Sequence, residues 1–135
     1  MANWYSTARS NYFRVKDKDA FLKWADSRGL GVFTSEESAD LFAIHGGGTD
    51  DGSWPSYDME GDTEIDIVVE LAPHLPRGQI AVLMEIGAEK LRYLTGVAIA
   101  VNHKGRVVDL TLNDIYRKAA RSFHVAESEI TQAAY

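Results

Sequence analysis

Carboxylates at every second position are the first feature of this sequence that could do chemistry. They are Asp58, Glu60, Asp62, Glu64 and Asp66. Hard cations such as Ca²⁺ and Mg²⁺ bind carboxylate oxygens, and an EF-hand loop would need Gly at its sixth place and Glu at its twelfth. Counted from Asp58, those places hold Thr63 and Val69. The pair Asp50 and Asp51 offers too few ligands on its own. We therefore predict neither a metal site nor a cofactor.

The glycine run that follows His45 is the second chemical candidate. Loops of the type His-Gly-Gly-Gly supply backbone N–H groups to an oxyanion in some esterases. The sequence contains no G-x-S-x-G nucleophile elbow, and it also lacks the P-loop, dinucleotide-binding and H-E-x-x-H motifs. We predict no catalytic residue and interpret the glycines as a turn that leaves a strand. The alternative, a small-molecule-binding protein or enzyme with a site near His45 and Glu85, requires these two side chains to converge.

Glu85 lies inside the apolar run AVLMEIG, where a carboxylate needs a partner. Arg14 or Arg92 on a neighbouring strand could provide one. We predict a buried structural ion pair rather than a functional carboxylate, because structural ion pairs are common in such surroundings.

Charge is distributed very unevenly along the chain. Between Arg28 and Arg77 there are eleven Asp and Glu residues and no Lys or Arg, so this segment carries −11. The rest has fourteen basic and nine acidic residues, or +5, within a total of −6. A negative field of this size attracts basic surfaces and repels phosphate backbones. Asp66 and Glu70 lie at i, i+4 in an expected helix, where like charges repel, and we take this repulsion as an indication of a binding face.

The predicted function is non-enzymatic binding of a basic surface on another protein. Trp54 and Tyr57 would be the anchors, since both residue types are enriched in interface hot spots. Four carboxylates without an expected helix-capping role accompany them in the acidic loop: Asp50, Asp51, Asp58 and Glu60. The sequence allows equally that Trp54 only holds this loop on the core, because Trp is commonly buried.

A further alternative is RNA or DNA binding through the N-terminal segment, where basic and aromatic residues are interleaved. They are Arg9, Arg14, Lys16, Lys18 and Lys23 with Trp4, Tyr5, Tyr12 and Phe13. The segment SNYFRVKD does not match the RNP pattern of RNA-binding sheets, and the pI is near 5.1. We rank direct nucleic-acid binding below a protein partner.

Composition predicts one folded domain over residues 1–135. Apolar residues make up 45% and charged residues 25%, as in ordinary globular proteins. The absence of Cys excludes disulfides and thiolate sites and favours a cytoplasmic protein. Neither a signal-peptide pattern nor an apolar run long enough to span a membrane is present, so we expect no membrane partner. Self-association remains open.

The hydrophobic pattern predicts an α+β fold with a mainly antiparallel sheet. In the first half we expect a strand at 10–16, a helix at 17–28, a strand hairpin from GLGVFTS and DLFAIHG, and a helix from a capping box at Thr63 to about Leu75. In the second half we expect strands within 80–87, 91–101 and 106–112 and a helix at about 114–124. The order corresponds to a ferredoxin-like β-α-β-β-α-β core extended by a C-terminal β-β-α.

The segments WYSTARSNYFRVKD and AVLMEIGAEKLRYLTGVAIAVN resemble small uncharacterised proteins of bacterial plasmids, prophages and other mobile elements. Anti-restriction and anti-CRISPR inhibitors belong to that setting. They are often small, acidic and non-enzymatic. The resemblance implies this setting and, for the partner, a nucleic-acid-binding defence protein of bacteria that this chain would inhibit. It assigns no site residue.

Overall fold

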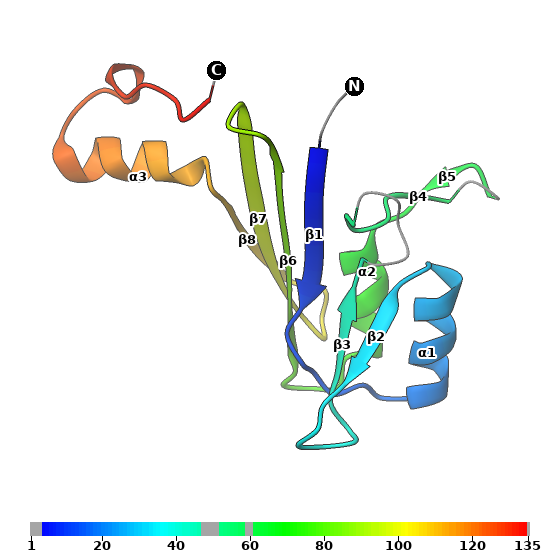
Figure 1. Cartoon of the computed structure of the whole chain (residues 1–135). Helices are drawn as coiled ribbons and strands as arrows, with labels where there is room; N and C mark the ends of the chain where they lie inside the picture. Colours follow the sequence, from blue (N-terminus) through cyan, green and yellow to red (C-terminus); the bar gives the residue numbers. More distant parts are fainter. Residues whose placement is uncertain (1–3, 47–51, 59–60, 135) are drawn as a thin grey trace.

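A computed structural model describes residues 4–46, 52–58 and 61–134 of the chain (Figure 1). Its main feature is a six-stranded sheet in the order β2-β3-β1-β6-β7-β8, in which every neighbouring pair is antiparallel. The strands are β1 (Trp4–Ser10), β2 (Gly31–Thr34), β3 (Phe42–His45), β6 (Ile80–Glu89), β7 (Tyr93–Asn102) and β8 (Val107–Thr111). The helices are α1 (Lys18–Ser27), α2 (Ile67–Leu71) and α3 (Asp114–Phe123), with 3-10 turns η1 (Ala72–His74) and η2 (Glu127–Glu129). The predicted α+β class and antiparallel sheet are confirmed.

The strand order differs from that of a four-stranded ferredoxin-like sheet. In a ferredoxin-like sheet, the last strand of the core forms an edge of the sheet. In this protein the corresponding strand is β6, which lies between β1 and β7, and β7 and β8 continue the sheet. A small hairpin of β4 (Tyr57–Asp58) and β5 (Thr63–Glu64), which the sequence did not predict, stands between β3 and α2.

The first predicted strand was placed too late in the chain. The strand ends at Ser10, because the next residue, Asn11, turns its side chain to β6, donating to the Ile80 carbonyl and accepting from the Val82 N–H. Phe13 makes only an isolated bridge to Phe42. The true strand was missed because its core-facing residues include Ser6, Ala8 and Ser10, which are too small to give an apolar alternation.

The expected strand hairpin in the first half is confirmed, and so are the strands expected near 91–101 and 106–112. Gly31–Thr34 pairs with Phe42–His45, and β7 pairs with β8 around the turn at Asn102–Gly105, where Gly105 has a φ of 81°. The apolar segment Ile80–Glu89 is a central strand, as its two apolar faces predicted.

The first two helices begin at side-chain caps. Asp17 caps α1 by accepting from the Ala20 N–H at 3.1 Å, and α1 gives way to Gly29, which has a φ of 69°. The predicted capping box at Thr63 was wrong, since Thr63 belongs to β5. Instead Asp66 caps α2 by accepting from the Val68 and Val69 N–H groups. A negative charge at this end also favours the helix dipole.

The core lies between one face of the sheet and the pair α1 and α2, and we call this the helix face. Phe21 of α1 makes an edge-to-face contact with Phe13 at 5.8 Å between ring centroids and packs against Phe42 at 5.5 Å. Leu71 of α2 and Leu83 of β6 complete the same cluster. The opposite side of the sheet is the open face, toward which neither α1 nor α2 is directed (Figure 1).

The last helix, α3, lies apart from this core. It projects from the end of β8 on the side of the sheet opposite to α1 and α2 (Figure 1), and none of its residues is buried. The C-terminal segment folds back on it, where the Ala133 N–H donates to the Tyr116 hydroxyl at 2.8 Å. Among the described residues, no helix is both long and apolar enough to cross a membrane.

Candidate binding groove

A groove of about 750 Å³ runs along the helix face, between the sheet and the segment that leads into α2. Its wall is formed by the loop from Ser53 to Ser56 together with the residues from Glu64 to Val68, because the Ile65 N–H donates to the Ser56 carbonyl at 3.1 Å. The floor consists of four side chains of β6 and β7: Leu83, Glu85, Val97 and Ile99. We call this hollow the acidic groove, because three carboxylates line it and the described lining includes no Lys or Arg.

Glu85 holds the loop wall in place. Its Oε1 accepts a hydrogen bond from the Trp54 backbone N–H at 2.9 Å. The predicted ion pair with Arg14 or Arg92 was therefore wrong. Arg92 lies over the ring of Tyr93, and Glu85 is half-buried rather than enclosed. A charged acceptor makes this a stronger bond than one between neutral groups.

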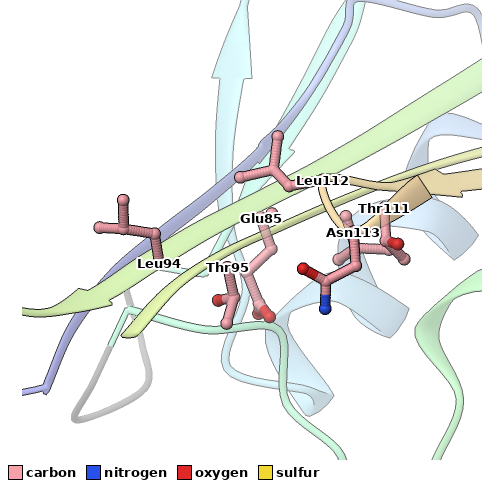
Figure 2. Close-up of a pocket in the computed structure, with 8 residues that line it drawn as sticks. Glu85, Leu94, Thr95, Thr111, Leu112 and Asn113 are labelled. Atoms are coloured by element: carbon pink, nitrogen blue, oxygen red, sulfur yellow. The ribbon is translucent and has the colours of Figure 1, made fainter. Parts of the chain in front are cut away.

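A second, smaller hollow of about 290 Å³ adjoins the acidic groove and shares Glu85 and Val97 with it. In Figure 2, Glu85, Thr95 and Asn113 point to one side of the sheet, whereas Leu94 and Leu112 point to the other. Glu85 thus lies where the apolar side chains of the acidic groove's floor meet a pocket with hydroxyl and amide groups. A lysine or arginine side chain is a chemical match for this combination, since its stem packs on apolar surface and its head pairs with a carboxylate.

Arg28 neutralises part of the acidic segment at the outer side of α2. Its guanidinium donates to both carboxylate oxygens of Glu70, at 2.7 and 3.0 Å, and lies 3.4 Å from Asp58 Oδ2. The Trp24 indole N–H also donates to Glu70 at 2.8 Å. The predicted repulsion between Asp66 and Glu70 is therefore not a sign of a binding face, because Asp66 caps the helix and Glu70 is paired.

The pKa values of this cluster follow from the same contacts. Burial is the largest influence on Glu70 and would raise the pKa of its carboxyl. The hydrogen bonds from Arg28 and Trp24 and the charge of Arg28 together outweigh burial, so the pKa lies below its ordinary value. The hydrogen bond to Glu70 likewise holds the pKa of Arg28 above its ordinary value.

Three of the six predicted binding residues lie in the described part of the chain. Trp54 lines the acidic groove and packs against the core, as expected if it holds this loop on the core, and its role as an interface anchor stays a prediction. Tyr57 is exposed, and its hydroxyl donates to Asp62, which raises the pKa of Tyr57. Asp58 is paired with Arg28 and accepts from the Gly61 N–H. Asp50, Asp51 and Glu60 lie outside the described residues.

The proposed convergence of His45 and Glu85 does not occur. Arg9 pairs directly with both His45 and Met84, whereas the next residue toward the N-terminus, Ala8, pairs with Glu85. Direct partners in an antiparallel sheet point to the same face and successive residues point to opposite faces. His45 therefore lies on the open face, stacked on Phe33 at 4.5 Å, and Glu85 lies on the helix face.

The aromatic residues near the N-terminus do not form one stacking surface. Phe13 is fully buried, Trp4 lies against Gly87 on the helix face, and Tyr5 is exposed on the open face. Arg9 lies over the rings of Tyr12 and Phe33. Of the four aromatic residues in this segment, Tyr5 and Tyr12 are exposed, and nucleic-acid binding through it stays an alternative prediction.

Within the described residues, no three His, Asp or Glu side chains are grouped so that they could hold a metal ion. Comparison with protein-family models, curated proteins and solved structures gave no match.

Sequence reasoning missed the floor of the groove. Val97 and Ile99 are ordinary strand residues, and only the pairing of β6 with β7 brings them beside Glu85. One available signal was the isolated carboxylate in an apolar strand, which correctly singled out Glu85 but did not indicate its backbone partner.

Proposed function

We propose that this chain is a non-enzymatic protein-binding module, and that its acidic groove receives a basic segment of another protein. The observation that carries the proposal is the position of Glu85, a half-buried carboxylate on the floor of a groove with apolar neighbours. A Lys or Arg side chain that enters the groove would place its stem against Val97 and Ile99 and its charge beside Glu85.

The net charge of the chain supports the same partner. The segment between Arg28 and Arg77 carries −11, and the pairing with Arg28 leaves most of this charge uncompensated. Long-range attraction of this kind raises the association rate with basic surfaces and weakens with salt. The exposed Tyr57, with Trp54 at the wall of the groove, would add aromatic contact area.

The proposal extends to fold and setting. The first four strands of the sheet, taken in the order β2-β3-β1-β6 with antiparallel pairs, support a ferredoxin-like description of the core. We place the protein in the bacterial cytoplasm, in the setting of mobile elements. A basic partner there would be a nucleic-acid-binding defence protein whose function this chain inhibits.

A charge-matched pair of variants tests the groove. In the groove variant, Glu64→Lys is combined with Glu85→Gln, which keeps an oxygen that can accept from Trp54. In the control, Glu36→Lys is combined with Glu37→Gln in the exposed loop between β2 and β3, which lies at the other end of the sheet (Figure 1). Both variants change the net charge equally, so only the location differs.

Each form is immobilised, and proteins captured from bacterial lysate are identified by mass spectrometry and then purified for titration. We expect a basic partner that the native chain and the control bind alike and that the groove variant binds at least about tenfold more weakly. Equal affinity for the groove variant would disprove the proposed site. A captured partner with an acidic surface would disprove the proposed chemistry.

A further inference from the structure

The open face of the sheet carries a continuous apolar surface. Direct pairing across β1, β6, β7 and β8 places six large side chains on this face: Tyr5, Met84, Ile86, Leu94, Val108 and Leu110. All of them are at least half exposed. The strands of this face are described completely, and the Asp, Glu, Lys, Arg and His side chains on it are Arg9 and His45. Monomeric soluble proteins rarely expose contiguous apolar patches beyond a few hundred Å².

A second apolar surface belongs to α3. Ile115 and Phe123 lie eight residues apart on one side of the helix and are 59% and 73% exposed. The opposite polar side carries Arg117, Lys118 and Arg121. The helix has no buried residue, although isolated helices of ten residues are marginal in water. It needs an apolar surface to lie against.

We infer that two copies of this chain form a symmetric dimer through their open faces, with α3 of each copy packed across the open face of the other. Each chain then supplies both the apolar sheet and the apolar helix that the interface requires, which is the self-complementarity of a two-fold contact. In Figure 1, α3 projects away from the sheet on the side of the open face. This is the direction in which it could reach the open face of a second copy.

The available area agrees with a stable dimer. The six sheet side chains and the two helix side chains are each at least half exposed. Together they present on the order of 1,000 Å² of accessible surface, and a standard interface buries roughly 800 Å² on each partner. Interface cores are depleted in charge, as this face is. Association through the open faces also keeps the two acidic segments apart, since β4, β5 and α2 lie on the other side of each sheet (Figure 1).

Light scattering after size exclusion tests the inference on the full chain in the micromolar range. We expect a mass of twice 15.0 kDa. Ile86→Lys places a charge in the centre of the open face and should raise the dimer dissociation constant by at least about a hundredfold. Phe123→Lys should do the same from the helix. Val69→Lys is the matched control, because Val69 is 64% exposed on α2 and Ile86 is 59% exposed, but Val69 lies on the other side of the sheet.

Circular dichroism checks that each variant is folded. We expect the monomer to fold with lysine at these positions, because all three side chains are exposed. A native chain of 15.0 kDa at these concentrations would overturn the inference. A dimer that withstands Ile86→Lys would overturn it too, because pairing through the free edge of β8 leaves Ile86 outside the contact. Loss of the dimer with Ile86→Lys but not with Phe123→Lys would overturn the placement of α3. The acidic groove lies on the helix face, so its own test is independent of this one.

Discussion

Phe21→Ala is expected to lower the free energy of unfolding by about 4 kcal/mol, which is the usual range for truncating a buried aromatic side chain. Phe21 has no exposed surface and contacts the rings of Phe13, Trp24, Phe42 and His74. These rings come from four separate parts of the chain. They cannot collapse into the space together, so most of the cavity should remain.

Urea unfolding at one fixed protein concentration measures this loss. The urea concentration at the midpoint of unfolding should fall. The slope of the unfolding free energy against urea concentration should stay the same, because the surface exposed on unfolding changes little. Val69→Ala serves as the control on an exposed helical position and should change stability by less than about 0.5 kcal/mol. A loss below about 1.5 kcal/mol for Phe21→Ala would mean that α1 is not packed on the sheet as described.

Glu70→Gln is expected to lower the free energy of unfolding by about 2 kcal/mol at pH 7, since hydrogen bonds to charged groups are worth roughly this much. In the variant, Asp58 is the carboxylate that stays beside the Arg28 guanidinium. The side chains of Arg28 and Glu70 are only 23% and 25% exposed, so water compensates for the lost contact in part. The Trp24 indole keeps an acceptor in the amide oxygen, but a weaker one.

The effect of Glu70→Gln should depend on pH in a defined direction. The pKa of Glu70 in the folded chain lies below the ordinary value of 4.5, so the folded state binds this proton more weakly than the unfolded state. The stabilisation is present in full above the ordinary pKa and is lost as the pH falls through the folded pKa. The native chain and the variant should therefore converge in stability as the pH falls below the ordinary pKa of Glu70 and through its lower pKa in the folded chain.

Urea titrations at several pH values follow this convergence. Glu36→Gln, which removes an exposed carboxylate in the loop between β2 and β3, should leave stability within about 0.5 kcal/mol at each pH. A difference between the native chain and Glu70→Gln that persists unchanged at low pH would show that the amide disturbs packing rather than removing a charge.

The ion cluster also changes how the acidic segment should be understood. Along the sequence, eleven carboxylates stand without a basic neighbour, yet Arg28 from the end of α1 reaches two of them. Asp66 serves as a helix cap and Glu85, outside the segment, fixes a loop. These local roles explain several of the carboxylates. The binding site that we propose is therefore the acidic groove and not the loop as a whole.

Local patterns in the sequence were sufficient for most elements. Apolar alternation, Asp17 and the glycine-containing turns identified α1, the hairpin of β2 and β3, and the three strands from β6 to β8. These signals act over a few residues, through side-chain periodicity and backbone preference. They failed at β1, whose core-facing residues are small, and at Thr63, where a capping-box pattern occurs in a strand instead of a helix.

The sequence by itself determined the α+β class, the central position of Ile80–Glu89 and the excess of negative charge between Arg28 and Arg77. Only the tertiary structure decided which side chains meet. Sheet register placed Glu85 and His45 on opposite faces, joined Glu85 to Trp54 and gathered the exposed apolar residues on one surface. The reason is that side chains alternate between the two faces of a sheet, so the face of each residue is known only when the strand's partners and register are known. Partners and register depend on residues far apart in the chain.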